Sequence, residues 1–150
     1  MTKNQLRQLA KIAEAKRTGG KQPRKNGSIG TKPTIPCQDL PESKVVEQCL
    51  KWLKSRGILA DRLNVGAMPS RDGRRFSRYG IKGAGDIIVC YEGRHIEIEA
   101  KAGKGGSLSI DQQIRQEQVE QAGGLYLIVH GVEELEYLLQ KDIIKKEFVI

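Results

Sequence analysis

Two carboxylates and a lysine lie at the ends of a segment whose pattern is otherwise typical of a β-hairpin. The segment is GAGDIIVCYEGRHIEIEAK, residues 83–101, with Asp86 near its start and Glu99 and Lys101 at its end. Two runs rich in β-branched residues lie between them, and Glu92-Gly93 is the simplest two-residue turn that joins the runs. That turn places Asp86 opposite Glu99.

The alternation of side chains along a strand assigns these residues to two faces of the hairpin. Cβ atoms of directly opposed residues lie about 5 Å apart, so Asp86 and Glu99 repel each other unless a cation lies between them. Paired carboxylates at this spacing suit Mg²⁺ or Mn²⁺. Lys101 is expected beside such an ion, where an ammonium group can stabilise a developing oxyanion or hold a water. The polar face would carry Asp86, Glu97, Glu99 and Lys101, and the core face Ile87, Val89, Ile96, Ile98 and Ala100.

The same residues also have a purely structural interpretation. Asp86 can cap the start of its strand, and Glu99 can pair with Lys101 or Arg94 on a solvated face. Alternating Ile-Glu-Ile-Glu is typical of a half-exposed strand, and Glu-x-Lys is common by chance. The hairpin taken alone therefore does not establish a catalytic site.

The surrounding pattern predicts an α/β domain with a mixed β-sheet flanked by helices, in the order α-β-β-β-α-β. A helix is expected from Pro41-Glu42 to Gly57, and another from Ser109 to Gly123-Gly124. The apolar run 125–130 is expected as a buried strand parallel to its neighbour. The remaining expected elements are a strand over 58–65, a hairpin or long loop over 64–79 with a turn at Asp72-Gly73, a last helix over 132–139 and a terminal strand over 147–150.

Charge divides the chain into two parts. Residues 1–34 carry nine lysines and arginines against one glutamate, which accounts for the whole net charge of +8. The other 116 residues carry 17 basic and 17 acidic side chains. We therefore predict a basic, largely disordered arm over 1–40, with a short helix within 5–16 and a linker over 19–36, and a folded domain over 41–150. Such an arm is typical of contact with polyanions or of a solubilising tail.

Several classes of protein are disfavoured by composition. The three cysteines are scattered along the chain and form no C-x-x-C pair. This argues against a zinc site and against a disulfide framework, and it favours a reducing, cytoplasmic setting. No apolar run approaches membrane-spanning length, and the N-terminus lacks a secretory signal. No motif for a small-molecule cofactor is present.

Four motifs in order resemble a known nuclease family. Gly-x-Gly-Asp, a hairpin and then Glu-Ala-Lys are similar to the PD-(D/E)XK nuclease superfamily. The stretch SLSIDQQIRQEQVEQAGG, with Leu108-Ser109-x-x-Gln112 before a helix, narrows the resemblance to the VRR-NUC (virus-type replication-repair nuclease) family. ESKVVEQCLKWLKSRG and GRRFSRYGIKGAGD also resemble that family, so the similarity spans about residues 42–130.

The resemblance implies a single PD-(D/E)XK-like domain and a role for each matching residue. Asp86 and Glu99 would bind the metal together with the carbonyl of Ala100, and Lys101 would be the catalytic lysine. Gln112 would orient water or the lysine, and Glu42 would assist the metal site. Three alternatives stay open: Glu47 can replace Glu42, Gln113 or Gln116 can replace Gln112, and Gln112 can merely cap its helix, because Ser109 precedes it with capping-box spacing.

A basic segment with interleaved aromatic residues precedes Asp86. Such a composition suits phosphate contact and base stacking, although Phe76 and Tyr79 can also be core residues of a solvated hairpin. The residues expected to contact nucleic acid are Arg71, Arg74, Arg75, Arg78, Tyr79 and Lys82. His95 and Trp52 are expected to have structural roles only.

The predicted activity is Mg²⁺-dependent (or Mn²⁺-dependent) hydrolysis of DNA by an endonuclease selective for branched, flap or nicked structure. The resemblance suggests a phage or prophage protein in a bacterial cell, and a homodimer would present two sites. The rival hypotheses are a non-catalytic nucleic-acid-binding module with a basic arm and a sequence-specific, restriction-type nuclease.

Overall fold

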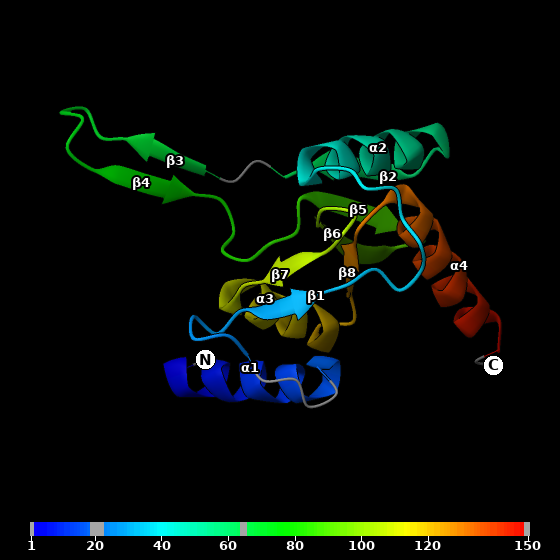
Figure 1. Cartoon of the computed structure of the whole chain (residues 1–150), viewed down its shortest axis with the longest axis horizontal. Coiled ribbons are helices and arrows are strands. Elements are labelled where there is room, and N and C mark those ends of the chain that lie inside the picture. The colour runs from blue at the N-terminus through cyan, green and yellow to red at the C-terminus, as the bar shows by residue number, and fades with distance from the viewer. Residues whose placement is uncertain (1, 19–22, 64–65, 149–150) are drawn as a thin grey trace.

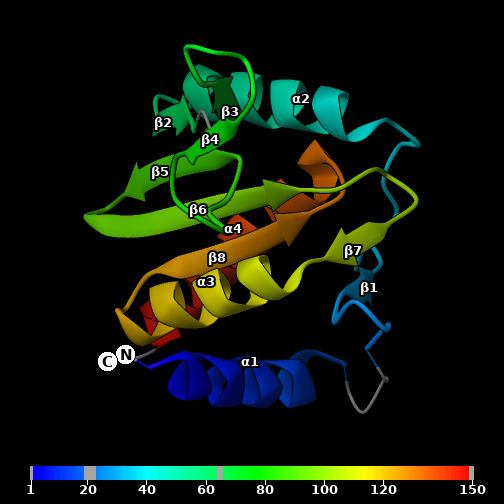
Figure 2. The same cartoon turned by 90° about the vertical axis from the view of Figure 1, so that its left-hand side faces the viewer.

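The computed structural model describes residues 2–18, 23–63 and 66–148. Its centre is a four-stranded mixed sheet in the order β2-β5-β6-β8 (Figures 1 and 2). The neighbours β2–β5 and β5–β6 are antiparallel, and β6–β8 are parallel. The bounds are β2 Leu59–Arg62, β5 Ile87–Tyr91, β6 Arg94–Ala100 and β8 Leu125–Val129. This confirms an α/β domain with a mixed sheet.

Helices cover both faces of the sheet. Helices α2 (Glu42–Ser55) and α4 (Val132–Phe148) share one apolar core with it, whereas α3 (Ile110–Gln121) packs on the other face. Figure 2 shows α3 and α4 on opposite sides of β8, with α1 (Lys3–Thr18) beyond α3. Helix α3 connects β6 to β8, which is the crossover that a parallel pair requires.

The hairpin register was predicted correctly. Ile87 pairs with Ile98, Val89 with Ile96 and Tyr91 with Arg94. Glu92 and Gly93 have φ angles of 49° and 76°, as expected for a turn with two left-handed residues. The side chains of Ile96, Ile98 and Ala100, at even-numbered positions of β6, therefore lie in the core shared with α2 and α4. The odd-numbered ones, including Glu97 and Glu99, face α3.

Helix α2 follows directly from its apolar stripe. Val45, Val46, Cys49 and Leu53 are buried at helical spacing. Burial raises the pKa of the Cys49 thiol to about 12, as expected for a small core residue. Gly57 has a φ of 69° and ends the helix, and its N–H donates to the carbonyl of Lys54.

Two small antiparallel ribbons accompany the main sheet. Strands β3 (Gly66–Pro69) and β4 (Phe76–Tyr79) form a hairpin that projects away from the body of the molecule (Figure 1). This confirms the expected hairpin and its Asp72-Gly73 turn, at which Gly73 has a φ of 69°. Strand β1 (Ile29–Thr31) pairs with β7 (Gly106–Leu108).

The segment expected to be a linker differs from the prediction over residues 23–36. Ile29 is buried, and β1 forms a ladder with β7. Thr34 donates from its backbone N and from Oγ1 to Glu134 Oε2, at 2.6 and 3.0 Å. Helix α1 also lies against α3. A composition of glycine, proline and lysine did not reveal this attachment, because its partners lie far away in the sequence.

The predicted terminal strand at 147–150 is wrong for Glu147 and Phe148, which belong to α4. No glycine or proline interrupts the chain between Val132 and Phe148, so nothing ends the helix after Leu139. Residues 149–150 lie outside the described part. Across the described residues, no helix combines the length and the apolar character needed to cross a membrane.

Candidate active site

Three carboxylates from three elements converge at one end of the sheet. Glu42 begins α2, Asp86 immediately precedes β5, and Glu99 lies near the end of β6. Each offers an oxygen, and these oxygens lie within 4.8 Å of one another. The accessibility falls from exposed Glu42 through half-buried Asp86 to Glu99, of which 3% is exposed. The structure thus brings together the three carboxylates that the sequence singled out.

The alternative carboxylate of α2, Glu47, lies elsewhere. Five helical positions rotate a side chain by about 140° relative to the first one, so Glu42 and Glu47 cannot share a face. Glu47 is exposed and forms an ion pair with Lys44, with 3.2 Å between Nζ and Oε2. Of the two candidates, Glu42 is the one that reaches Asp86 and Glu99.

Asp86 is held by the backbone of both neighbouring strands. The N–H of Ala100 donates to Asp86 Oδ2 at 2.9 Å. The carbonyl of Asp86 accepts from the N–H of Leu63 at 2.8 Å. Gly85 lies so close to Ile98 that a Cβ there would be within 3 Å of the Ile98 backbone. These contacts fix the backbone and one oxygen of Asp86, and they leave Oδ1 for a ligand.

Lys101 and Gln112 complete the buried side of the site. Lys101 Nζ donates to Glu99 Oε1 at 3.1 Å and to Gln112 Oε1 at 3.3 Å. Gln112 Nε2 donates to Glu99 Oε1 at 2.7 Å. Lys101 is itself buried, with 6% of it exposed. The glutamine therefore contacts both the metal-binding candidate and the lysine.

Gln112 also caps its helix, so the capping box and the contacts with Lys101 and Glu99 exist side by side. Ser109 Oγ accepts from the N–H of Gln112 at 3.3 Å, and Gln112 Oε1 accepts from the N–H of Ser109 at 3.0 Å. The other two candidate glutamines have different partners. Gln113 Nε2 donates to the carbonyls of Gly27 and Leu108, and Gln116 Nε2 donates to Glu120 Oε1 and to the carbonyl of Tyr126.

The electrostatics of the cluster favour a bound cation. Burial, and then the charge of Asp86, raise the pKa of Glu99 to about 7, against the lowering effect of Lys101. Burial also raises the pKa of Asp86, although the N–H of Ala100 and the charge of Lys101 oppose the shift. A hard divalent ion would offset this repulsion, and a set of carboxylate oxygens is the donor set it prefers. The residues present therefore fit Mg²⁺ or Mn²⁺.

A second buried carboxylate, Glu97, supports the loop that carries Asp86. Arg115 donates to it with Nε, 3.1 Å from each oxygen, and with Nη2, 2.6 Å from Oε2. The N–H of Gly85 donates to Oε1 at 3.1 Å, and His95 Nε2 lies 2.6 Å from Oε2. Burial alone would raise the pKa of Glu97, but the hydrogen bonds from Arg115, His95 and Gly85 lower it.

Sequence reasoning placed Glu97 on the correct face but gave it no partner, and it missed Arg115. A signal was present. Arg115 lies three positions after Gln112, so both project from the same side of α3. A helix that presents Gln112 to Glu99 must also present Arg115 to the strand. His95 is exposed, as expected, and adds a ring nitrogen to this network.

The basic residues predicted to bind nucleic acid fall into two groups. Arg71, Arg74 and Arg75 are exposed and line a hollow at the tip of the β3–β4 hairpin. Lys82 lies instead at the other end of the hairpin and pairs with Asp111, with 3.5 Å between Nζ and Oδ1. The side chains of Arg78 and Tyr79 lie outside the described ones. Phe76 is 72% exposed, which excludes the alternative that it is a core residue and leaves the expected contact with nucleic acid as a prediction.

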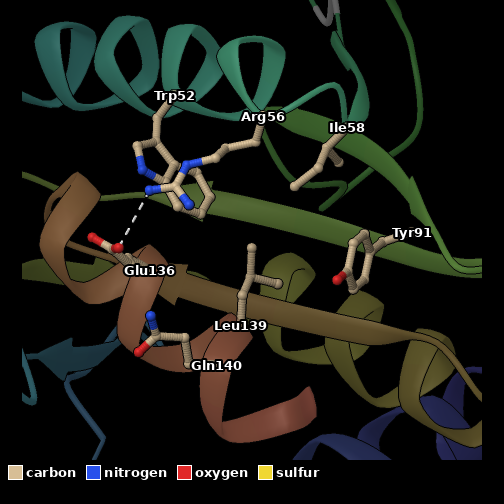
Figure 3. A pocket seen from close by; sticks show the side chains of 7 residues that line it. All are labelled: Trp52, Arg56, Ile58, Tyr91, Glu136, Leu139 and Gln140. Carbon is tan, nitrogen blue, oxygen red and sulfur yellow. Dashed lines mark ion pairs between the residues drawn. The ribbon is translucent and has the colours of Figure 1, made fainter.

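A different pocket, of about 260 Å³, lies at the opposite end of the β5–β6 hairpin from Asp86 (Figure 3). The Arg56 guanidinium lies over the Trp52 ring, 4.8 Å from its centroid, and pairs with Glu136 at 3.5 Å. Trp52 packs against the main core, as predicted. The pocket also includes Tyr91 beside the hairpin turn. It is separate from the carboxylate cluster.

Comparisons with protein-family models, curated proteins and solved structures gave no match to this chain. The resemblance to the VRR-NUC family therefore stays a prediction carried by the four motifs.

Proposed function

We propose that this protein is a metal-dependent nuclease that hydrolyses phosphodiester bonds in DNA. The observation that carries the proposal is the convergence of Glu42, Asp86 and Glu99, with ligand oxygens within 4.8 Å of one another and Lys101 Nζ 3.1 Å from Glu99. The order of the motifs around these residues resembles the VRR-NUC family of the PD-(D/E)XK superfamily.

Asp86 and Glu99 would hold Mg²⁺ or Mn²⁺, with Glu42 and the carbonyl of Ala100 as further ligands. When bound, such an ion polarises a phosphoryl oxygen and lowers the pKa of a coordinated water. The Lys101 ammonium group lies 3.1 Å from Glu99 Oε1. It would stabilise the negative charge that develops on the phosphoryl oxygens as the water attacks and the P–O bond breaks.

Gln112 is a positioning residue in this scheme. Its amide oxygen accepts from Lys101 and its amide nitrogen donates to Glu99, so it fixes the lysine and the carboxylate relative to each other. The capping box fixes Gln112 in turn, because the same amide oxygen accepts from the N–H of Ser109. Removal of Gln112 would take one hydrogen-bond partner from each of the two site residues and leave only their direct contact.

DNA is the proposed substrate because the tip of the β3–β4 hairpin carries three exposed arginines against one aspartate. Arginine is well suited to bidentate phosphate contacts. Asp72 is engaged within the tip, where the Ser70 hydroxyl and the N–H of Arg74 donate to it. We propose that the enzyme is selective for branched, flap or nicked DNA and that it recognises the shape of the DNA more than its base sequence.

Cleavage assays on linear, nicked, flap and four-way DNA, with Mg²⁺ and then with EDTA, test the proposal. We expect the wild type to cleave DNA in Mg²⁺ and not in EDTA. In Mg²⁺, Glu99→Gln should not cleave, and the matched variant Glu47→Gln should cleave at the wild-type rate. DNA binding without metal-dependent cleavage in any substrate would instead support the non-catalytic binding module. Cleavage at one fixed sequence in linear DNA would support the restriction-type nuclease.

A further inference from the structure

The β3–β4 hairpin exposes a large aromatic side chain beside its arginines. Phe76 is 72% exposed and pairs across the ribbon with Pro69. Arg74 and Arg75 directly precede it. Met68, 62% exposed, pairs with Ser77 and therefore lies on the opposite face of the ribbon. One face of the hairpin thus combines an aromatic ring with a prolyl ring, next to three guanidinium groups.

The described segments on both sides of the hairpin, up to Leu63 and from Gly80 onward, contact residues at or beside the candidate active site. On the side of β3, the N–H of Leu63 donates to the carbonyl of Asp86 at 2.8 Å. On the side of β4, the carbonyl of Gly83 accepts from the Tyr126 hydroxyl at 3.0 Å, and Gly85 is bound to Glu97. A Cβ at Gly83 would collide with the backbone of Asp111, so this segment lies tightly against α3. The hairpin is therefore anchored next to Asp86.

We propose that Phe76 stacks on an unpaired nucleobase of the DNA that lies in the active site, while the arginines of the tip hold the adjoining phosphates. This inference rests on the proposed nuclease function and specifies how the structure of the substrate is recognised. An aromatic side chain can stack on any base, because every base has a π-face.

The energetics turn such a contact into discrimination between DNA shapes. Stacking one base on an aromatic side chain strengthens binding by roughly tenfold to a hundredfold. In an intact duplex the base must first be unpaired and unstacked, which costs about as much as the contact gains. At a flap, nick or junction this cost is small or absent. Phe76 therefore strengthens binding to interrupted DNA and leaves binding to intact DNA nearly unchanged.

The hairpin also predicts where the cut lies relative to the interruption. Strand β4 spans about 10 Å from Phe76 to Tyr79, and the hairpin to which it belongs projects away from the sheet (Figure 1). Successive nucleotides of one strand are spaced by about 3.4 Å. The stacked base is thus expected roughly three or more nucleotides from the scissile phosphate, at a constant offset.

The test uses paired substitutions on the two faces of the ribbon, with affinities measured in EDTA at low salt so that cleavage is not required. We expect Phe76→Ala to weaken binding to a flap by about tenfold to a hundredfold and to an intact duplex by less than about threefold. Met68→Ala should change neither affinity. Both side chains are exposed, so thermal unfolding of each variant should match the wild type.

A second readout places a fluorophore at each position. Trp52 is the single native tryptophan and lies in the distant pocket of Figure 3. Phe76→Trp should show fluorescence quenched by a flap but little by intact duplex, whereas Met68→Trp should respond to neither. Equal loss of affinity for both DNAs with Phe76→Ala, or equal quenching at the two positions, would overturn the inference.

These outcomes separate this inference from the nuclease proposal. Stacking at position 76 without any Mg²⁺-dependent cleavage would refute the nuclease and retain the contact. Cleavage that is normal in rate, substrate preference and offset with Phe76→Ala would retain the nuclease and refute the contact.

Discussion

Glu99 and Gln112, from β6 and α3, are joined by a hydrogen bond of 2.7 Å between Gln112 Nε2 and Glu99 Oε1. The bond places the start of α3 directly over the end of β6, and it encloses Glu99 so that only 3% of it is exposed. The buried position of this carboxylate has consequences that can be measured.

Glu99→Gln should abolish cleavage and leave the fold intact. The raised pKa of Glu99 means that its charged form destabilises the metal-free fold. At pH values above about 8, where Glu99 is charged, the neutral amide of the variant should therefore give a higher melting temperature than the wild type. The relevant measurement is thermal unfolding with and without Mg²⁺. Addition of Mg²⁺ should stabilise the wild type and Glu47→Gln, and should stabilise Glu99→Gln much less. Cleavage by Glu99→Gln at a rate near that of the wild type would remove the metal site from this cluster.

The stability of the metal-free protein should depend on pH between about 4.5 and 7. A carboxyl whose pKa is 4.5 in the unfolded chain and about 7 in the folded one binds its proton more tightly when folded. Its contribution is fully present below pH 4.5 and is lost as the pH rises through 7. The loss is about 3 kcal/mol at 1.36 kcal/mol per pKa unit. Denaturant unfolding across this range should show the slope.

Glu99→Gln provides the control for this slope, because it removes the group whose pKa is about 7 and keeps Asp86, whose pKa is also raised from its ordinary value of 3.8. The pKa values of Glu97 and Glu134 are lowered from 4.5. Protonation of these two carboxylates therefore destabilises the fold only below pH 4.5, outside the range of the Glu99 slope. Stabilisation by Mg²⁺ should also fade as the pH falls below 7, since the proton and the cation compete for Glu99. An identical slope in wild type and variant would show that Glu99 does not titrate in this range.

Lys101→Ala should reduce turnover by about a hundredfold or more, by analogy with the loss of one oxyanion-hole donor, and leave substrate affinity nearly unchanged. Single-turnover cleavage and DNA binding in EDTA, measured in parallel, separate the two quantities. A matching loss of affinity would make Lys101 a phosphate-binding residue and would favour the non-catalytic binding module.

The two roles of Gln112 can be separated by comparing it with Ser109. Ser109→Ala removes the helix cap and should cost about 1 kcal/mol of stability, with little effect on cleavage. Gln112→Ala should cost a similar amount of stability and also lower the rate, because Lys101 and Glu99 lose their shared partner. Equal activity in the two variants would reduce Gln112 to a capping residue.

The basic N-terminal segment is expected to bind DNA through its phosphates. Deletion of residues 1–34 would not isolate this role, because it also removes β1 and the hydrogen bonds of Thr34 with Glu134. Arg7 and Lys11 of α1 are exposed and one helical turn apart, so the double change to glutamine is preferable. Each phosphate that the variant fails to neutralise should flatten the plot of log affinity against log salt by about 0.9 on duplex DNA.

Lys51 and Lys54 of α2, which are exposed on the other side of the sheet, provide the matched control for this measurement. Their replacement by glutamine removes the same charge and should leave the salt dependence unchanged. Equal flattening by both pairs would mean that only the net charge of the protein matters.

The meeting of Asp86 and Glu99 at the end of the sheet was predictable because strand alternation is a local rule. A turn at Glu92-Gly93 fixes which residues oppose Asp86, and parity then assigns Glu99 to the polar face. The helical spacing from Val45 to Leu53 likewise fixes the direction of α2, and hence the choice of Glu42. The residues that cover Glu99 belong to another element and could not be predicted from the hairpin alone. The burial of that face depends on α3, whose contact with it runs through polar side chains such as Gln112 and Arg115.

The attachment of residues 23–36 was not predictable, and the choice between an exposed and a buried Phe76 stayed open, for a related reason. Strand β1 has three residues and no alternation long enough to detect. An aromatic residue in a hairpin is a core residue or a surface residue depending on whether the ribbon packs on the sheet. Only the position of the whole hairpin decides between them.

The bond from Thr34 to Glu134 links residues that are 100 positions apart, and this separation has a consequence for biosynthesis. A ribosome adds about 5 to 20 residues per second, so Glu134 leaves it roughly 5 to 20 s after Thr34. For most of that interval β1 also lacks its partner strand β7, and α1 lacks α3, against which it lies. The carboxylates and Lys101 are all synthesised before Glu134, so every residue of the candidate site is present in the nascent chain before Thr34 can bind α4.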